Sequence, residues 1–171
     1  QRLMVLGIAG SSAGTLLTWA DKAQAGAKRG GRLRAGIAHG STTDSLDPGT
    51  YENGFMSKIN YAIQNHLGEV DHTGSMSPEL AESWDPQNGA KTWVFNLRKG
   101  VEFHNGKSLT TGDVVASIDK HRGEDTTSYA KGVFSGISDV RVDGNAVVVE
   151  LADGNADCPA LFTDYHFNIM P

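Results

Sequence analysis

Regular alternation of apolar and polar side chains in the middle of the chain constrains the fold more than any other feature. Between residues 91 and 103 the large apolar side chains fall at Trp93, Phe95, Leu97, Val101 and Phe103, with Thr92, Val94, Asn96 and Arg98 between them. A period of two puts one set of side chains on one face of a β-strand. The pattern therefore predicts a strand over residues 91–103 with one face buried in a core.

Turn signals bracket this strand, and a helix start follows it. Asn88-Gly89 and Asn105-Gly106 are turn dipeptides, because Asn and Gly accept a positive φ at low cost. Thr110 or Thr111 can then cap a helix that begins near Asp113, whose carboxylate suits a first turn. The order turn, strand, turn, helix predicts a compact α/β unit.

Further elements are predicted on both sides of this unit. Residues 137–142 and 146–151 are rich in β-branched residues, and the Asp143-Gly144-Asn145 turn between them predicts a hairpin. Residues 55–67 carry apolar side chains at helical spacing, which predicts an amphipathic helix packed on a sheet. Alternation over residues 32–38 predicts a first strand.

The polar, glycine-interrupted segment 120–130 is expected to form an exposed loop. It contains Tyr129. The chain contains no internal repeat and no low-complexity segment.

The first 25 residues are typical of a secretory signal peptide. Arg2 precedes an apolar tract over residues 3–17, and Ala23-Gln24-Ala25 gives the small-x-small pattern of a cleavage site. The alternative is a membrane anchor, but the tract contains several Gly and Ser residues and is short for a span. Both the general secretory route and the twin-arginine route are open, and both predict a location outside the cytoplasm.

Charge and cysteine content argue against a nucleic-acid-binding domain and against a disulfide-stabilised fold. The net charge is −5 and the fifteen Lys and Arg residues are scattered, whereas a nucleic-acid-binding domain concentrates them on one face. Cys158 is the single cysteine, so no intrachain disulfide can form. Its place before Pro159 in an apolar stretch predicts a buried, unreactive thiol.

Residues that could carry chemistry lack the spacing that chemistry needs. None of the six His residues forms an HExxH or a similarly dense ligand pattern. His66 and His72 lie six positions apart, which leaves a zinc or nickel site conceivable, but no metal site is predicted. No nucleophile stands in an elbow motif and no phosphate-binding loop is present. The prediction is therefore no enzyme, no cofactor and no catalytic residue.

Three motifs together resemble one protein family. They are Leu80-Ala81-Glu82-Ser83-Trp84, the LRKGVEFHNGK run of residues 97–107, and Asp113-Val114-Val115 at the helix start. This combination resembles the extracytoplasmic solute-binding proteins of family 5, the peptide and nickel type that serves bacterial ABC importers. The resemblance extends over residues 30–171 and implies an α/β periplasmic-binding-protein-like fold of class II with two lobes.

The resemblance also implies a domain organisation. After the signal peptide of residues 1–25, residues 26–45 correspond to the N-terminal arm and first strand of the large lobe. Residues 46–171 correspond to the small α/β subdomain of lobe I, which returns toward the large lobe at its C-terminal end. The chain is interpreted as an N-terminal fragment, with the second lobe outside it.

The function that the resemblance implies is capture without chemistry. A periplasmic, monomeric protein would bind di- or oligopeptides and dock transiently to a membrane permease. The ligand-binding residues expected at the cleft are His39, Ser41, Thr42, Thr43 and Tyr129, although residues 39–43 also fit a plain polar loop. Other solutes (nickel, a metal chelate, a sugar oligomer), a ligand-sensing partner of a receptor and, less favoured, a secreted hydrolase are the alternatives.

Overall fold

The computed structural model describes residues 30–171. The chain divides into two units, Gln1–Gly36 and Ile37–Pro171, and the described helices and strands all belong to the second. The predicted signal peptide, residues 1–25, lies outside the described residues. The strand predicted over residues 32–38 is not formed, because no strand within residues 30–171 pairs with this exposed segment. Alternation cannot make a strand without a neighbouring edge to hydrogen-bond.

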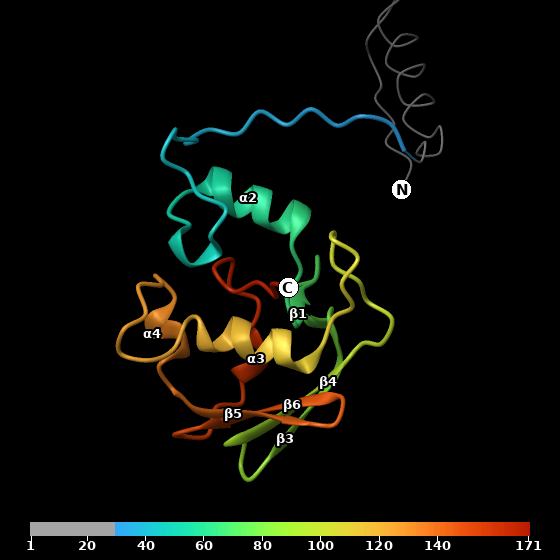
Figure 1. The fold of residues 1–171 in the computed structure, drawn as a ribbon, viewed down its shortest axis with the longest axis vertical. Helices are drawn as coiled ribbons and strands as arrows, with labels where there is room; N and C mark the ends of the chain where they lie inside the picture. The colour runs from blue at the N-terminus through green and yellow to red at the C-terminus, as the bar shows by residue number, and fades with distance from the viewer. Residues whose placement is uncertain (1–29) are drawn as a thin grey trace, which may run out of the picture. The chain divides into compact units, whose positions relative to one another are not determined.

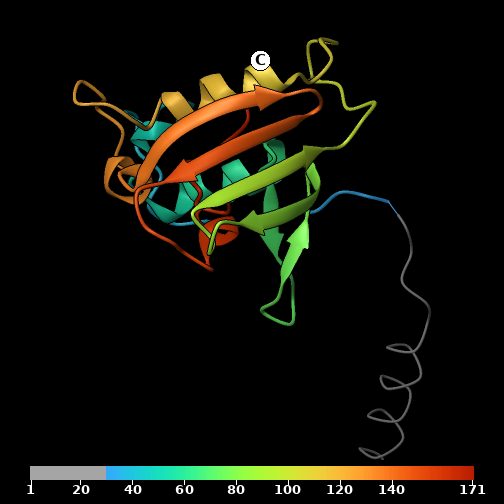
Figure 2. The same ribbon diagram turned by 90° about the horizontal axis from the view of Figure 1, so that it is seen from below.

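An antiparallel sheet of four strands organises the second unit (Figure 1). In sheet order the strands are β3 (Ala81–Gln87), β4 (Thr92–Leu97), β6 (Ala146–Leu151) and β5 (Ile137–Asp143). Helix α3 (Thr111–Asp119) lies along one face and contacts β5 and β6 (Figure 2). The α/β class is confirmed.

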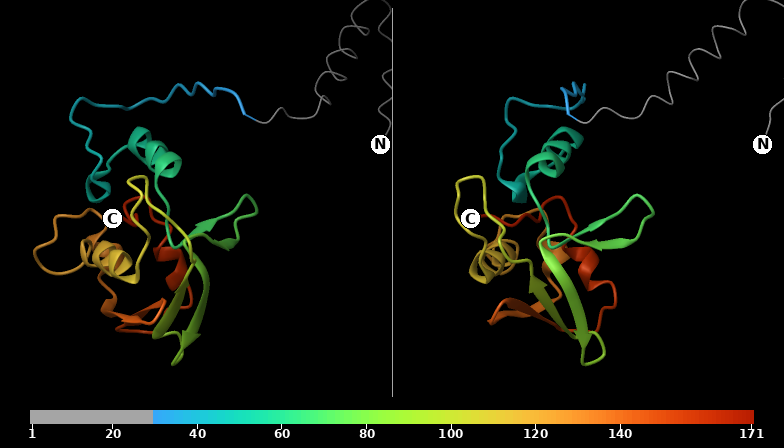
Figure 3. Two further views of the ribbon diagram at one scale, coloured as in Figure 1. Left: turned by 45° about the vertical axis from the view of Figure 1, so that its right-hand side comes forward. Right: turned by 90° about the vertical axis from the view of Figure 1, so that its right-hand side faces the viewer.

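The remaining elements are short, with one exception. They are the 3-10 turn η1 (Pro48–Thr50), α2 (Gly54–Ile63), β1 (Gly68–Val70), β2 (Met76–Pro78), α4 (Lys131–Phe134) and α5 (Cys158–Leu161). Strands β1 and β2 pair with each other as a separate hairpin that projects away from the larger sheet (Figure 3). The longest of these elements, α2, is the one that the candidate site uses.

The buried face of β4 confirms the alternation. Trp93, Phe95 and Leu97 are 5%, 0% and 2% exposed. The Phe95 ring meets the ring of Phe162 edge-on, with centroids 5.0 Å apart. Side chains from β6, α3 and the C-terminal segment complete the core around it, among them Val147, Val149, Ile118 and Phe167. Burial of this set supplies the main hydrophobic stabilisation of the unit.

The predicted strand is nevertheless too long. β4 ends at Leu97 rather than at Phe103, because the chain turns at Gly100, which adopts a φ of +73° that glycine tolerates. Val101 and Phe103 lie beyond this turn and pack, partly buried, against the same core. The predicted C-terminal end of the strand was therefore wrong, because the period of two continues across the turn.

The predicted helix start is confirmed, and the structure shows which of the two threonines caps it. Thr110 is the N-cap of α3: its hydroxyl oxygen accepts from the Asp113 amide at 3.3 Å, and Asp113 Oδ2 accepts from the Thr110 amide at 2.9 Å. This reciprocal pair is a capping box. Burial alone would raise the pKa of Asp113, but hydrogen bonds from Lys107 and Thr110 hold it below its usual value.

Helix α2 corrects the prediction for residues 55–67. It begins after the Asn53 cap and ends at Ile63, four residues before the predicted end. Leu67 is buried, but it lies in the segment that leads into β1 and not in the helix. It packs on the C-terminal segment and not on the sheet (Figure 1): Asn60 Nδ2 donates to the Tyr165 carbonyl at 3.0 Å. The apolar spacing identified the helix but not the surface that it covers.

Two smaller predictions are confirmed. The β5–β6 hairpin turns at Gly144, with a φ of +58°. Cys158 is fully buried, and burial raises the pKa of its thiol to about 12, so the reactive thiolate is strongly disfavoured. Within residues 30–171, no helix has the length and apolar character that crossing a membrane requires.

Candidate functional site

The polar loop that the sequence singled out is exposed and internally ordered. Ser41 donates its amide to Asp44 Oδ2 at 2.7 Å, and the hydroxyls of Ser41 and Thr43 are 2.9 Å apart. Thr42 and His39 are exposed beside them, and His39 adopts a φ of +73°. Local side-chain to backbone bonds of this kind fix a loop without a sheet or helix. The loop thus presents several hydroxyls and one imidazole to solvent.

This loop is fastened to the start of α2. Asn53 Nδ2 donates to Asp44 Oδ1 at 2.8 Å, while Asn53 Oδ1 caps the helix by accepting from the amides of Phe55 and Met56, each at 3.0 Å. Gly40 lies against the Phe55 ring, so closely that a Cβ there would stand 3.4 Å from it. One asparagine therefore joins the helix cap to the loop.

Tyr129 reaches the same segment from the 120–130 loop. Its hydroxyl donates to Glu52 Oε1 at 2.5 Å, and its amide donates to the Gly49 carbonyl at 2.9 Å. The ring is 57% exposed, and the hydrogen bond to Glu52, followed by the charge of that carboxylate, raises the pKa of the Tyr129 hydroxyl. Among the described residues, Tyr129 shares no hydrogen bond with the 39–43 loop. One connection between them runs through Glu52, the partner of Tyr129, and the next residue, Asn53, which bonds to Asp44 beside the loop.

The 120–130 segment is less exposed than its sequence predicts. His121 is fully buried and Ser128 is 9% exposed, with His121 Nδ1 2.6 Å from the Ser128 hydroxyl oxygen. The His121 ring stacks on Phe134 at 5.2 Å. Burial, followed by the positive charges of Lys120 and His166, lowers the pKa of His121 to about 4. A polar composition did not reveal that one of its histidines belongs to the core.

An ion pair fastens this loop to the N-terminal segment. Lys120 Nζ lies 2.6 Å from Asp47 Oδ1, and Asp47 also accepts from the Gly49 amide at 3.0 Å. Burial works against the charge of Asp47, but these two partners outweigh it and lower the pKa of the carboxyl. Segments 47–52 and 120–130 are therefore tied at two points, here and at Tyr129.

His166 contacts Tyr51 in the N-terminal segment and pairs with Asp164. The two side chains are arranged like the histidine and the carboxylate of a catalytic triad. Asp164 Oδ1 is 2.7 Å from His166 Nδ1, as a base-orienting carboxylate would be. The other ring nitrogen, Nε2, is 2.8 Å from the Tyr51 carbonyl oxygen. A backbone acceptor occupies the position that a nucleophile would need, so this pair is not poised for general-base chemistry. Nothing in the sequence pattern had marked His166.

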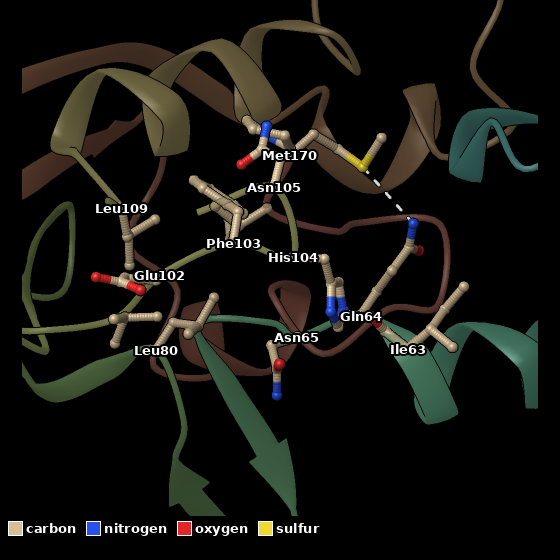
Figure 4. Close-up of a pocket in the computed structure, with 13 residues that line it drawn as sticks. Ile63, Gln64, Asn65, Leu80, Glu102, Phe103, His104, Asn105, Leu109 and Met170 are labelled. Carbon is tan, nitrogen blue, oxygen red and sulfur yellow. Dashed lines mark hydrogen bonds between the residues drawn. The ribbon is translucent and has the colours of Figure 1, made fainter. Parts of the chain in front are cut away.

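A mostly apolar pocket of about 340 Å³ opens elsewhere on the unit (Figure 4). Its wall comes from the end of α2, the 101–109 turn and the last three residues, with Ile63, Phe103, Leu109 and Met170 among the lining side chains. His104 reaches across it to the Ile63 carbonyl at 3.0 Å. This contact agrees with a structural role for His104. None of the five predicted ligand-binding residues lines this pocket.

The histidine pair considered for a metal does not form a site. His66 is buried and its Nδ1 lies 3.6 Å from Glu79 Oε2, while His72 is exposed. Across residues 30–171, no group of three or more His, Cys, Asp or Glu side chains is arranged to hold a metal ion. Burial would raise the pKa of Glu79, but hydrogen bonds from His66 and Asn65 lower it. The carboxylate therefore serves the local fold.

Sequence comparison identifies the family. The model of the middle region of bacterial extracellular solute-binding proteins, family 5, matches residues 75–171. The periplasmic oligopeptide-binding protein OppA of Escherichia coli is 32% identical over 118 residues, which cover 66% of this chain and 21% of that protein. The chain belongs to family 5 of the bacterial extracellular solute-binding proteins.

Solved structures agree with this membership. AgaA of Agrobacterium tumefaciens, in complex with agropinic acid, superposes with a TM-score of 0.70 at 26% identity, over 74% of this chain and 26% of that chain. AppA of Bacillus subtilis, in complex with a nonapeptide, gives a TM-score of 0.66 at 25% identity, over 74% and 25%. The periplasmic-binding-protein-like fold class is confirmed. This chain spans about a quarter or less of the length of these relatives.

Proposed function

We propose that this chain is part of the solute-binding component of an ABC importer, which captures peptides in the periplasm and delivers them to a membrane permease. The observation that carries the proposal is the family match over residues 75–171. Peptide is the preferred cargo because the E. coli relative is an oligopeptide-binding protein and AppA was solved with a nonapeptide. Binding and delivery need no chemistry, so the proposed protein would not be an enzyme.

The proposed whole is a monomer of two lobes that close on the ligand by hinge motion. Residues 1–25 would export it. Residues 26–45 would belong to the large lobe, and residues 46–171 to the small subdomain of lobe I. In this arrangement the exposed segment at residues 32–38 would become a strand once the large-lobe sheet supplies its neighbour.

The proposed ligand contacts are the exposed groups of the 39–43 loop together with Tyr129. A peptide backbone offers alternating N–H donors and C=O acceptors, and the hydroxyls of Ser41, Thr42 and Thr43 can act as either partner. His39 adds an imidazole at the edge of the loop. Tyr129 contributes an exposed ring whose hydroxyl Glu52 holds in place.

The first test is to read the coding sequence on both sides of this chain. Continuation for several hundred codons beyond Pro171 would supply a second lobe, and calorimetry of the complete product with di- to pentapeptides should then detect binding. A stop codon directly after Pro171, or a complete product that binds no peptide, would contradict the proposal.

The second test concerns the contacts. In the complete product, the double substitution Ser41→Ala and Thr43→Ala should weaken peptide binding roughly tenfold if each hydroxyl makes one net-favourable hydrogen bond. Ser135→Ala is the matched control, because Ser135 is exposed and its hydroxyl donates to the nearby Gly132 carbonyl at 2.8 Å. Equal peptide affinity of the double variant and the control would show that the hydroxyls of Ser41 and Thr43 do not contact the ligand.

A different cargo is the leading alternative, because AgaA has a similar fold and was solved with agropinic acid. Nickel or a metal chelate, a sugar oligomer and a sensing role toward a receptor belong to the same class of proposals. The calorimetric series separates the cargoes, and permease and ATPase genes beside this one would favour import over sensing.

A further inference from the structure

Both ring nitrogens of His166 face oxygen atoms that can only accept. Nδ1 is 2.7 Å from Asp164 Oδ1, and Nε2 is 2.8 Å from the Tyr51 carbonyl oxygen. The residue is 8% exposed, so water cannot readily take either place. A neutral imidazole carries a single N–H, and its other nitrogen would point a lone pair at an oxygen lone pair. Two short contacts to acceptors require two ring protons.

We propose that His166 is held as the doubly protonated imidazolium and that, in this form, it is a positioning residue for the proposed binding surface. The charge state follows from the two contacts alone. The statement that the positioned surface binds a ligand rests on the proposed function.

The charge has a partner suited to it. Asp164 Oδ1 also accepts from the His166 amide at 2.9 Å, so the carboxylate receives two donors from one residue, as an ionised group favours. The neighbouring histidine, His121, does not compete for a proton, because burial keeps it neutral at pH 7. One buried imidazole is thus charged and paired, while the other is neutral.

The position of Tyr51 explains how this charge orders the surface. Tyr51 is 1% exposed, and its hydroxyl donates to the Leu46 carbonyl at 3.2 Å. Its carbonyl, held by His166, lies between Gly49 and Glu52, which are the two acceptors of Tyr129. The imidazolium therefore fixes the middle of the segment whose two flanks hold Tyr129.

Other titratable or charged groups also lie around His166. Tyr165 and Tyr129 are 4.0 Å and 6.4 Å from it between ring centroids, and Tyr61 interacts with Asp164. The charged groups of the neighbouring segments have partners of their own: Glu52 accepts from the Tyr129 hydroxyl, and Lys120 pairs with Asp47.

The experiment is side-chain nitrogen NMR on the purified chain labelled with ¹⁵N-histidine. At neutral pH both nitrogens of His166 should show the shifts of protonated, N–H-bearing nitrogens, and Asp164→Asn, which removes the counter-charge but keeps an acceptor oxygen, should return one of them to the unprotonated value. A single unprotonated nitrogen in the unsubstituted chain would overturn the charge assignment.

Amide hydrogen exchange tests the positioning role. The Tyr129 amide should exchange roughly tenfold faster in His166→Gln and in Asp164→Asn, because a charge-assisted bond to the acceptor segment is lost. His72→Gln is the control, since His72 is exposed and outside this region. Unchanged Tyr129 exchange in Asp164→Asn would overturn positioning, and this variant decides the matter if His166→Gln does not fold.

Ligand binding separates this inference from the proposed function. If the complete product binds peptide, Asp164→Asn should weaken binding several-fold, and equal affinity would overturn the link to the ligand. If no solute binds while the NMR and exchange results are as expected, the proposed function fails and the charged His166 stands.

Discussion

The sheet with its α3 cover and the N-terminal segment of residues 39–53 are held by different kinds of interaction. In the sheet, backbone ladders and buried rings such as Phe95 and Phe162 provide the order. In the N-terminal segment, separate hydrogen bonds and ion pairs do so, among them Asn53 to Asp44, Lys120 to Asp47, and Tyr129 to Glu52. Many cooperative contacts stabilise the sheet, so the loss of one contact leaves most of its order in place. In the N-terminal segment, each bond can be removed separately by a single substitution.

The largest effect is expected in the sheet. Phe95→Ala should lower the free energy of unfolding by about 3–5 kcal/mol, because a fully buried ring among Trp84, Trp93 and Phe162 leaves a cavity. Urea denaturation followed by tryptophan fluorescence measures it. Val142→Ala on the exposed part of β5 is the control and should stay within about 0.5 kcal/mol. A loss below about 1 kcal/mol for Phe95→Ala would show that the sheet is not the stabilising centre.

The second effect is a pH dependence that originates in the loop joined to the N-terminal segment. Burial lowers the pKa of His121 to about 4 in the folded chain, against about 6.5 for an unperturbed histidine, so the unfolded chain binds a proton first as the pH falls. Stability should therefore fall as the pH drops from about 6.5 to about 4, by roughly 3 kcal/mol from this group. Above pH 6.5 the contribution is constant.

Urea denaturation at pH 7 and pH 4.5 measures this dependence in the unsubstituted chain and in His121→Gln. Carboxyl groups also titrate at low pH, so the informative quantity is the difference between the two proteins. The variant should lose less stability on acidification, while His72→Gln should behave like the unsubstituted chain. Parallel losses in all three proteins would show that His121 becomes charged without cost in the folded state.

The same contrast explains which parts of the structure the sequence could predict. The face of β4, the Thr110 cap and the β5–β6 hairpin depend on residues close together in the chain, and each was predictable. The end of β4 was not, because Gly100 interrupts an alternation that continues beyond it. Strand β3 was recognised only as a family motif, since Pro86 and its exposed polar residues hide its pairing with β4.

The candidate site was predictable only in outline. Exposure of the 39–43 loop follows from its polar composition, but the contact between Tyr129 and Glu52 spans 77 positions, and that between His166 and Tyr51 spans 115. Side-chain bonds over such separations leave no local pattern. His121 and His166 therefore resemble ordinary loop histidines in the sequence, although both are buried in the structure.

A smaller effect is expected at the start of α3. Thr110→Ala removes one half of the capping box and should cost about 1 kcal/mol. Thr111→Ala is a matched control one residue away, because the hydroxyl of Thr111 does not cap the helix. Chemical denaturation compares the two. Equal losses would mean that either threonine can serve as the cap, which the sequence alone had left open.

The smallest effect on global stability is expected at Tyr129. Tyr129→Phe removes the hydroxyl bond to Glu52 from a ring that is 57% exposed, so the free energy of unfolding should change by less than about 0.5 kcal/mol. Tyr61→Phe, with a similarly exposed ring and a 3.4 Å bond to the Thr163 carbonyl, is the control for loss of a surface hydroxyl.

Hydrogen exchange should nevertheless distinguish these two tyrosines. Exchange in residues 49–53 should rise in Tyr129→Phe and not in Tyr61→Phe, because Glu52 loses its partner only in the former. A loss of global stability as large as that of Thr110→Ala would instead place residues 39–53 in the same cooperative unit as the sheet. The N-terminal segment would then be part of the folded core, and its side-chain bonds could not be adjusted independently of the rest of the fold.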